Sequence, residues 1–150
     1  INDAIGEGRC TVICPIADAF VGHHGSLGGF VRIYCDDGTP RELIIEAIED
    51  IPGIERIWTA EAVAKELEQP LDREGDIAVV GDKKTVIGGR AVDHDLSALK
   101  GHRLRTHGSL HEAKIPFVLS APLNGTYAER AANGNLRSHD IFDFSINGTA

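Results

Sequence analysis

The stretch Phe30-Val31-Arg32-Ile33-Tyr34-Cys35, followed by the turn Asp36-Asp37-Gly38 and by Thr39-Pro40-Arg41-Glu42, decides the fold class of this 150-residue chain. The first six residues are rich in β-formers and predict a strand. Thr39 to Glu42 has the pattern of a capping box with proline at the first helical position, which predicts a helix start. Together with the elements predicted below, the order strand, helix, strand, helix, hairpin favours an α+β arrangement.

The same signals predict the other elements. The helix after Thr39 should place its apolar residues inward and end at Pro52-Gly53; these residues are Leu43, Ile44, Ala47, Ile48 and Ile51. Thr59 should cap a second helix that ends before Pro70. We expect strands at 9–16, 30–35, 54–58, 76–80, 84–87 and 115–120, with 76–80 and 84–87 forming a hairpin, and late helices at 127–132 and 139–145.

Composition narrows the classes of function. Lys+Arg 15 against Asp+Glu 23 gives a net charge of −8, which argues against nucleic acid and anionic membranes as partners. No apolar run approaches the ~20 residues that span a bilayer. The three cysteines are an odd number without CxxC spacing, so we expect a reduced, cytoplasmic setting. Cys10 and Cys14 should share one face of the first strand as small buried residues.

The chain begins with Ile1 and contains no methionine. A translated protein starts with methionine, so we expect this chain to be a processed product or a fragment of a longer protein.

His107 is the strongest candidate for a functional residue. It lies in the loop Arg105-Thr106-His107-Gly108-Ser109-Leu110-His111-Glu112, just before the predicted strand at 115–120. Gly108 permits a close backbone approach, which suits a metal ligand at the mouth of a sheet. Glu112 is placed either to accept backbone N–H bonds or to orient the imidazole. The alternative is a loop histidine that caps a strand or faces solvent.

The remaining histidines are less specific. His94 between Asp93 and Asp95 forms a ligand-like cluster, but a solvated acidic turn has the same sequence. The pair His23-His24 lies in a glycine-bounded loop and could contact an anion or a metal, or lie on the surface without chemistry. His102 and His111 have no distinguishing context. No nucleophile elbow, P-loop or H-E-x-x-H motif is present, so the chain alone holds no recognisable catalytic machinery.

Three stretches resemble the phosphonoacetate hydrolase branch of the alkaline phosphatase superfamily, near the nucleotide pyrophosphatase/phosphodiesterases. They are residues 15–30, which include His23-His24-Gly25-Ser26-Leu27-Gly28-Gly29, residues 104–116 with Thr106-His107-Gly108, and residues 73–82. The resemblance covers most of the chain and corresponds to the C-terminal part of such an enzyme. The histidine-rich glycine loop is what indicates the phosphonoacetate branch.

The resemblance implies a cap subdomain at 1–90 and, at 91–150, the last strand and helices of an alkaline-phosphatase-like α/β core. Such enzymes hold two zinc ions and cleave the carbon–phosphorus bond of phosphonoacetate to acetate and phosphate. His107 matches the last zinc ligand, Glu112 would support it, and His23 and His24 would line the substrate cleft from the cap. No catalytic residue is expected in this chain, because the threonine nucleophile and the other ligands match sequence upstream.

The expected partners are therefore a small phosphonate substrate and the upstream part of the same enzyme, and a homodimer stays open. By itself the chain should be inactive. Two alternatives remain: a phosphate ester hydrolase of the phosphodiesterase/nucleotide pyrophosphatase type, and a non-catalytic binding domain.

Overall fold

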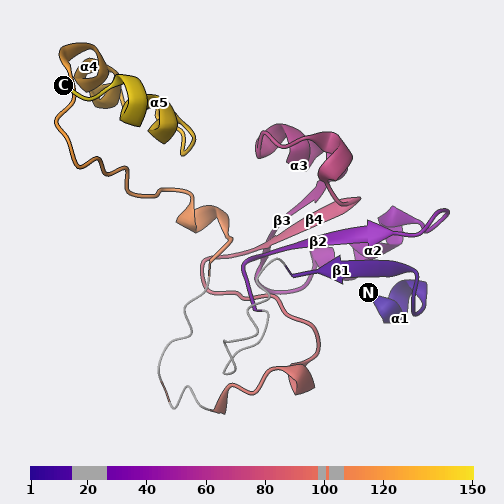
Figure 1. The fold of residues 1–150 in the computed structure, drawn as a ribbon. Helices are drawn as coiled ribbons and strands as arrows, with labels where there is room; N and C mark the ends of the chain where they lie inside the picture. Colours follow the sequence, from indigo (N-terminus) through magenta and orange to yellow (C-terminus); the bar gives the residue numbers. More distant parts are fainter. Residues whose placement is uncertain (15–26, 98–100, 102–106) are drawn as a thin grey trace. The chain divides into compact units, whose positions relative to one another are not determined.

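The structure is a computed structural model that describes residues 1–14, 27–97, 101 and 107–150. The chain divides into two compact units, Ile1–Glu112 and Ala113–Ala150. The first unit holds a four-stranded sheet and the second holds two helices (Figure 1). This division falls later in the chain than the boundary that we predict at 90/91, and the functional meaning of that boundary stays a prediction.

The sheet of the first unit has the strand order β1-β2-β4-β3, and all three neighbouring pairs are antiparallel. β4 lies between β2 and β3, so all of its residues are buried. The α-helices and strands of this unit are α1 (Asn2–Ile5), β1 (Cys10–Ile13), β2 (Phe30–Cys35), α2 (Arg41–Glu49), β3 (Ile54–Thr59), α3 (Ala60–Glu66) and β4 (Ile77–Gly81). The predicted α+β class is confirmed.

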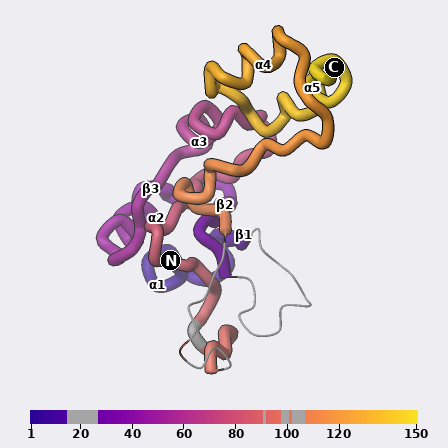
Figure 2. The backbone as a smooth tube through the Cα atoms, turned by 90° about the vertical axis from the view of Figure 1, so that its left-hand side faces the viewer, coloured from indigo at the N-terminus to yellow at the C-terminus, as the bar shows by residue number. Residues whose placement is uncertain are grey.

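Apolar side chains cover both faces of the sheet, because successive residues of a strand point to opposite sides. On one face α2 buries Ile44 and Ile48 in a cluster with four strand residues, Val31, Ile33, Ile77 and Val79. On the other face Val63 of α3 packs in a cluster with Phe30, Ala78 and Val80. Figure 2 follows the chain from β3 directly into α3.

The two helix starts in this unit differ in how they are capped. Thr59 caps α3 as predicted, since its hydroxyl accepts the N–H of Ala62 at 3.4 Å. The capping box predicted at Thr39 is wrong: α2 has no side-chain cap and begins at Arg41. The Thr39 hydroxyl instead donates to the carbonyl of Arg9 at 3.1 Å, and Thr39 is buried by this contact. A tertiary hydrogen bond has therefore replaced the local one.

Three further predictions for this unit need correction. Leu43, Ala47 and Ile51 are exposed, because α2 covers the sheet only with the stripe around Ile44 and Ile48. Residues 84–87 form no strand, and the hairpin with 76–80 is absent. Ile87 instead makes an isolated antiparallel bridge with Gly28. β4 has no free edge for a hairpin partner, since β2 and β3 already occupy both of its edges.

The second unit contains α4 (Gly125–Ala132) and α5 (Asp140–Asn147). Phe144 is its one fully buried large side chain, and its ring meets those of Phe117 and Tyr127 edge-on, at centroid distances of 5.1 and 5.0 Å. The strand predicted at 115–120 is wrong. Residues 113–120 are irregular, because a strand needs a hydrogen-bonded partner and none of the described residues pairs with them.

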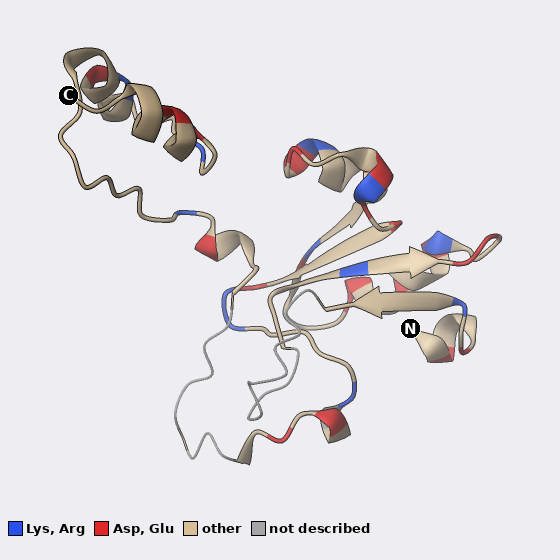
Figure 3. Ribbon diagram, in the orientation of Figure 1, with Lys and Arg blue, Asp and Glu red and all other residues tan. Residues whose placement is uncertain are grey.

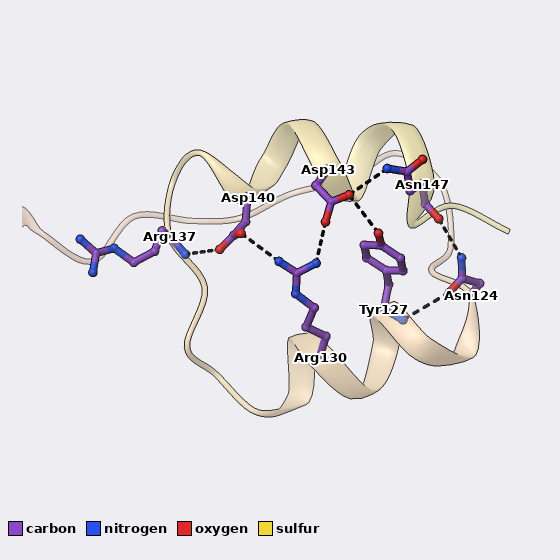
Figure 4. Close-up of polar contacts among 7 residues, drawn as sticks. All are labelled: Asn124, Tyr127, Arg130, Arg137, Asp140, Asp143 and Asn147. Carbon is purple, nitrogen blue, oxygen red and sulfur yellow. Dashed lines mark hydrogen bonds and ion pairs between the residues drawn. The ribbon is translucent and has the colours of Figure 1, made fainter. Parts of the chain in front are cut away.

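Polar contacts hold α4 to α5 (Figure 4). Arg130 bridges Asp140 at 3.0 Å and Asp143 at 2.6 Å, while the Tyr127 hydroxyl donates to Asp143 at 3.0 Å. Asn147 also donates to Asp143, at 2.8 Å. The hydrogen bonds from Asn147, Arg130 and Tyr127 lower the pKa of Asp143 to about 2.

Charged residues concentrate on helices and turns, and the strands are mostly uncharged (Figure 3). An exception is Arg32 in the middle of β2, which forms a two-point ion pair with Glu74 at 2.7 and 3.0 Å. The Glu74 carboxylate is almost fully buried by this pair. In the part of the chain that the structure describes, no helix is both long and apolar enough to cross a membrane.

Candidate functional site

The loop that carries His107 lies against the start of β2. The N–H of Gly29 donates to the carbonyl of His107 at 3.0 Å. A Cβ on Gly29 would lie 2.8 Å from the backbone nitrogen of Ser109, so only glycine allows this approach. Gly108 adopts a φ of 97°, a conformation that favours glycine, and it lies beside Phe30. The two glycine-bearing stretches that carry the family resemblance therefore meet in the structure.

Glu112 holds this loop in shape. Its carboxylate accepts the backbone N–H of Ser109 at 2.9 Å and the Ser109 hydroxyl at 2.6 Å. The Ser109 hydroxyl in turn accepts the N–H of His111 at 3.2 Å. These contacts cap the short 3-10 helix η4 (Leu110–Glu112), and Leu110 packs against the cluster around Phe30. Two roles were expected for Glu112, and the structure shows the first, in which its carboxylate accepts a backbone N–H.

The imidazole of His107 is exposed, while its backbone is fixed by Gly29. Among the residues that the structure describes, none is hydrogen-bonded to its ring. Neutral imidazole is a common ligand of zinc. Within residues 1–14, 27–97, 101 and 107–150, no three His, Cys, Asp or Glu side chains gather at a distance that suits a metal ion.

His111, four residues further along, contacts strand β3. Its Nε2 lies 2.8 Å from a carboxylate oxygen of Glu55 on β3. This contact joins the His107 loop to the edge of the sheet. The sequence offered no context for His111, since Glu55 is 56 residues away.

The Asp93-His94-Asp95 cluster is occupied by local contacts. The Nε2 atom of His94 accepts the N–H of Gly89 at 2.9 Å. Asp93 pairs with Arg90 at 3.0 Å, and Asp95 accepts the N–H of Ser97 at 2.9 Å. The three side chains do not converge on a common point, which favours the turn over the ligand cluster.

Three of the histidines considered above, His23, His24 and His102, lie outside the described residues. The place of His23 and His24 in a substrate cleft therefore stays a prediction. The described end of their loop, Gly28-Gly29, is the part that contacts His107 and Ser109.

Two structural relatives match almost the whole chain. They are phosphonoacetate hydrolase from Sinorhizobium meliloti 1021 in complex with phosphonoformate and the same enzyme in complex with phosphonoacetate. Each shares 33% sequence identity with this chain, with a TM-score of 0.75 over 99% of it. The chain is similar to a part of phosphonoacetate hydrolase. The resemblance that the sequence indicated is thereby confirmed.

A curated sequence relative agrees with this result. Phosphonoacetate hydrolase from Penicillium oxalicum is 55% identical over 31 residues, which are 21% of this chain and 43% of that protein. No model of a known protein family matches the chain. The chain spans about a third of the length of the solved phosphonoacetate hydrolase, since it covers 35% of it.

Sequence reasoning missed the role of Ser109. The spacing Ser109-x-x-Glu112 is that of a capping box, which is the signal that could have revealed why this loop has a fixed shape. It also missed the close contact of Gly29 with Ser109. The paired glycines Gly28-Gly29 next to a strand were the available signal, because a glycine there often marks a close approach of two backbones.

Proposed function

We propose that this chain forms the C-terminal part of a zinc-dependent hydrolase that cleaves the carbon–phosphorus bond of phosphonoacetate, giving acetate and phosphate. The observation that carries the proposal is the contact between Gly29 and the His107 loop. Both stretches belong to the family resemblance, and a hydrogen bond of 3.0 Å joins them.

The proposal assigns His107 as a zinc ligand. Its exposed ring and its immobilised backbone suit this role, and Glu112 keeps the loop in the required shape through Ser109. A single imidazole does not retain zinc against water, so the other ligands must come from polypeptide that corresponds to the unmatched part of the relatives. We therefore expect the isolated chain to be inactive.

Two bound zinc ions would supply charge stabilisation for the attacking and leaving groups of a phosphoryl transfer. The contribution of this chain would be positional. The Gly29–His107 hydrogen bond would hold the His107 loop against the start of β2. The Glu112–Ser109 contacts would keep the same loop in its folded shape. The cap at 1–90 would place His23 and His24 near the substrate.

A chimera tests the proposal. This chain replaces the aligned third of the Sinorhizobium meliloti enzyme, and the purified chimera is assayed with phosphonoacetate. We expect equal amounts of acetate and phosphate, and two zinc ions per subunit. Faster hydrolysis of phosphate mono- or diesters than of phosphonoacetate would favour the phosphate ester hydrolase instead. A folded chimera that hydrolyses neither would favour the binding domain.

The role of His107 is tested in the same chimera. His107→Ala should remove one zinc and reduce kcat/KM by more than about 100-fold, because even loss of a group that only orients a ligand costs 10–100-fold. His111→Gln is the matched control, since it changes a partly exposed histidine of the same loop whose ring faces Glu55. Unchanged zinc content and rate in His107→Ala would contradict the assignment.

A further inference from the structure

Cys10 and Cys35 lie directly opposite each other on neighbouring strands. They are Cα partners in the antiparallel pairing of β1 with β2. In such a pairing, opposed residues alternate between hydrogen-bonded and non-hydrogen-bonded pairs, and only the latter bring Cα atoms to about 4.5 Å. Which kind of pair Cys10 and Cys35 form therefore decides how close their side chains are.

The backbone hydrogen bonds answer this question. The N–H of Asp36 donates to the carbonyl of Arg9 at 3.0 Å, so the preceding pair, Arg9 with Asp36, is hydrogen-bonded. The N–H of Cys35 points to the other side of β2 and donates to Asp76 at 2.7 Å. Cys10 and Cys35 are therefore a non-hydrogen-bonded pair, with a Cα separation inside the range of about 4.4–6.8 Å that a disulfide requires.

The surroundings of the two thiols agree with this placement. Both side chains are half-buried and pack against the same apolar cluster beneath α2, so they project from the same face of the sheet. Burial raises the pKa of the Cys35 thiol, and the negative charges of Asp76 and of a Cys10 thiolate add to the shift. Burial also raises the pKa of Cys10. Both thiols are therefore mostly protonated at neutral pH, and their oxidation requires a reagent.

We propose that Cys10 and Cys35 are a site of reversible oxidation. A small-molecule disulfide converts their two thiols to an intramolecular disulfide. One thiolate attacks the reagent, forms a mixed disulfide and releases the first reagent thiol. The second cysteine loses its proton, attacks the mixed disulfide and releases the other reagent thiol. The two cysteines are oxidised by two electrons, and the reagent disulfide is reduced to two thiols.

Cys14 has no part in this site. It lies four residues beyond Cys10, and a strand advances about 3.3 Å per residue, so Cys14 is about 13 Å further along. This distance exceeds the reach of a disulfide from either Cys10 or Cys35. The structure therefore selects one of the three pairings that three cysteines allow.

The consequence would be a cross-link at the open end of the β1–β2 pair. β1 is an edge strand of only four residues, and its one neighbour is β2. A covalent bond from its first residue to the last residue of β2 would hold this edge strand on the sheet. The amides of β1 should then exchange with solvent more slowly than in the reduced chain.

The experiment treats the full chain with oxidised glutathione and counts free thiols under denaturing conditions. We expect a fall from three thiols to one, reversed by dithiothreitol, with slower amide exchange in β1. After trypsin, the peptide 10–32 should be joined to 33–41. Since Cys10 and Cys14 share a peptide, the cysteine variants are needed to assign the bond.

In Cys14→Ser both remaining thiols should disappear, whereas Cys10→Ser and Cys35→Ser should each form no intramolecular disulfide. Circular dichroism of the reduced variants checks that they are folded. The proposal is overturned if Cys14→Ser abolishes the cross-link, or if folded wild-type chain ends as a stable mixed disulfide with glutathione. A disulfide between two chains on a non-reducing gel, in place of the internal one, overturns it as well.

Discussion

In the unit Ile1–Glu112, apolar side chains are removed from water on both faces of a sheet, whereas the unit Ala113–Ala150 buries one large side chain, Phe144. The second unit surrounds that ring with charged and polar contacts, centred on Arg130 and Asp143. Exposed ion pairs contribute little to stability, typically 0–1 kcal/mol each, and a buried phenylalanine contributes about 1.5–3 kcal/mol. The two units therefore differ in how much stability they can generate alone.

This difference indicates that the second unit gains less stability from apolar burial than the first. Compact units below about 40 residues rarely fold alone, because they bury too little surface to offset the conformational entropy of ordering the chain. Four large apolar side chains of this unit are exposed; they are Ile115, Val118, Phe142 and Ile146. The first unit also exposes large apolar side chains, but it buries an apolar cluster on each face of its sheet, under α2 and α3.

The largest effect is expected where the second unit depends on one side chain. Phe144→Ala should cost about 3–5 kcal/mol, because it removes the ring on which Phe117 and Tyr127 pack. Amide exchange of α4 and α5 should approach that of an unfolded chain, while β2 and β4 stay protected. Phe142→Ala on the same helix is the control and should change little, since that ring is 71% exposed.

In the first unit a substitution of one buried side chain leaves the rest of a larger core in place. Ile33→Ala should destabilise the sheet by about 2–5 kcal/mol, and Ile33→Val by about 0.5–1.5 kcal/mol. Ile33 is fully buried in β2. Urea unfolding followed by the fluorescence of Trp58, the one tryptophan, measures both values. Equal costs for the two variants would show that this position is less tightly packed than the structure indicates.

A smaller effect is expected at the contact between the His107 loop and β2. Gly29→Ala should cost about 1–3 kcal/mol, because its Cβ would lie 2.8 Å from the Ser109 backbone, which cannot rotate away. The NMR signals of His107 and Ser109 should shift with it. Gly125→Ala is the control, since a Cβ there meets nothing within 4 Å. Unshifted His107 signals in Gly29→Ala would contradict the close contact.

The smallest effect concerns the pH dependence of the second unit. The pKa of Asp143 is lowered from 3.8 to about 2 by its bonds to Asn147, Arg130 and Tyr127. A carboxylate with a lowered pKa in the folded state stabilises that state above the unfolded pKa, and this contribution is lost as the pH falls from 3.8 towards 2. Amide exchange of α5 should therefore accelerate over this range.

In Asp143→Asn the second unit should be less stable at neutral pH, and the acceleration between pH 3.8 and 2 should be weaker. Glu129→Gln on α4 is the control and should keep the wild-type pH profile. If Asp143→Asn keeps that profile too, the acid sensitivity arises at another carboxylate.

The sequence predicted those elements that are determined by local signals. β2 was predicted residue for residue, because its β-formers are bounded by glycines and by the turn at Asp36-Asp37-Gly38. The cap at Thr59 was also predicted correctly. Two of the failures are due to a distant partner: Thr39 bonds to Arg9, and Ile87 pairs with Gly28. The strand predicted at 115–120 failed because no described strand pairs with it.

The same distinction between local signals and distant contacts applies to the candidate site. The residue types and spacing around His107 and Glu112 were visible in the sequence, and so was the family resemblance. The contact of Gly29 with His107 joins residues far apart in the chain, so no local pattern specifies it. The pairing of His111 with Glu55 was hidden for the same reason.

The central position of β4 has a consequence for the order in which the protein is made. During synthesis β1, β2 and β3 leave the ribosome before Ile77–Gly81, but β2 and β3 are not neighbours and meet only through β4. Until β4 emerges, their inner edges have no native partner and are open to pairing with other nascent chains. Closure of the sheet is thus a single event that waits for β4, and ribosomes stalled before residue 77 should carry an aggregation-prone intermediate.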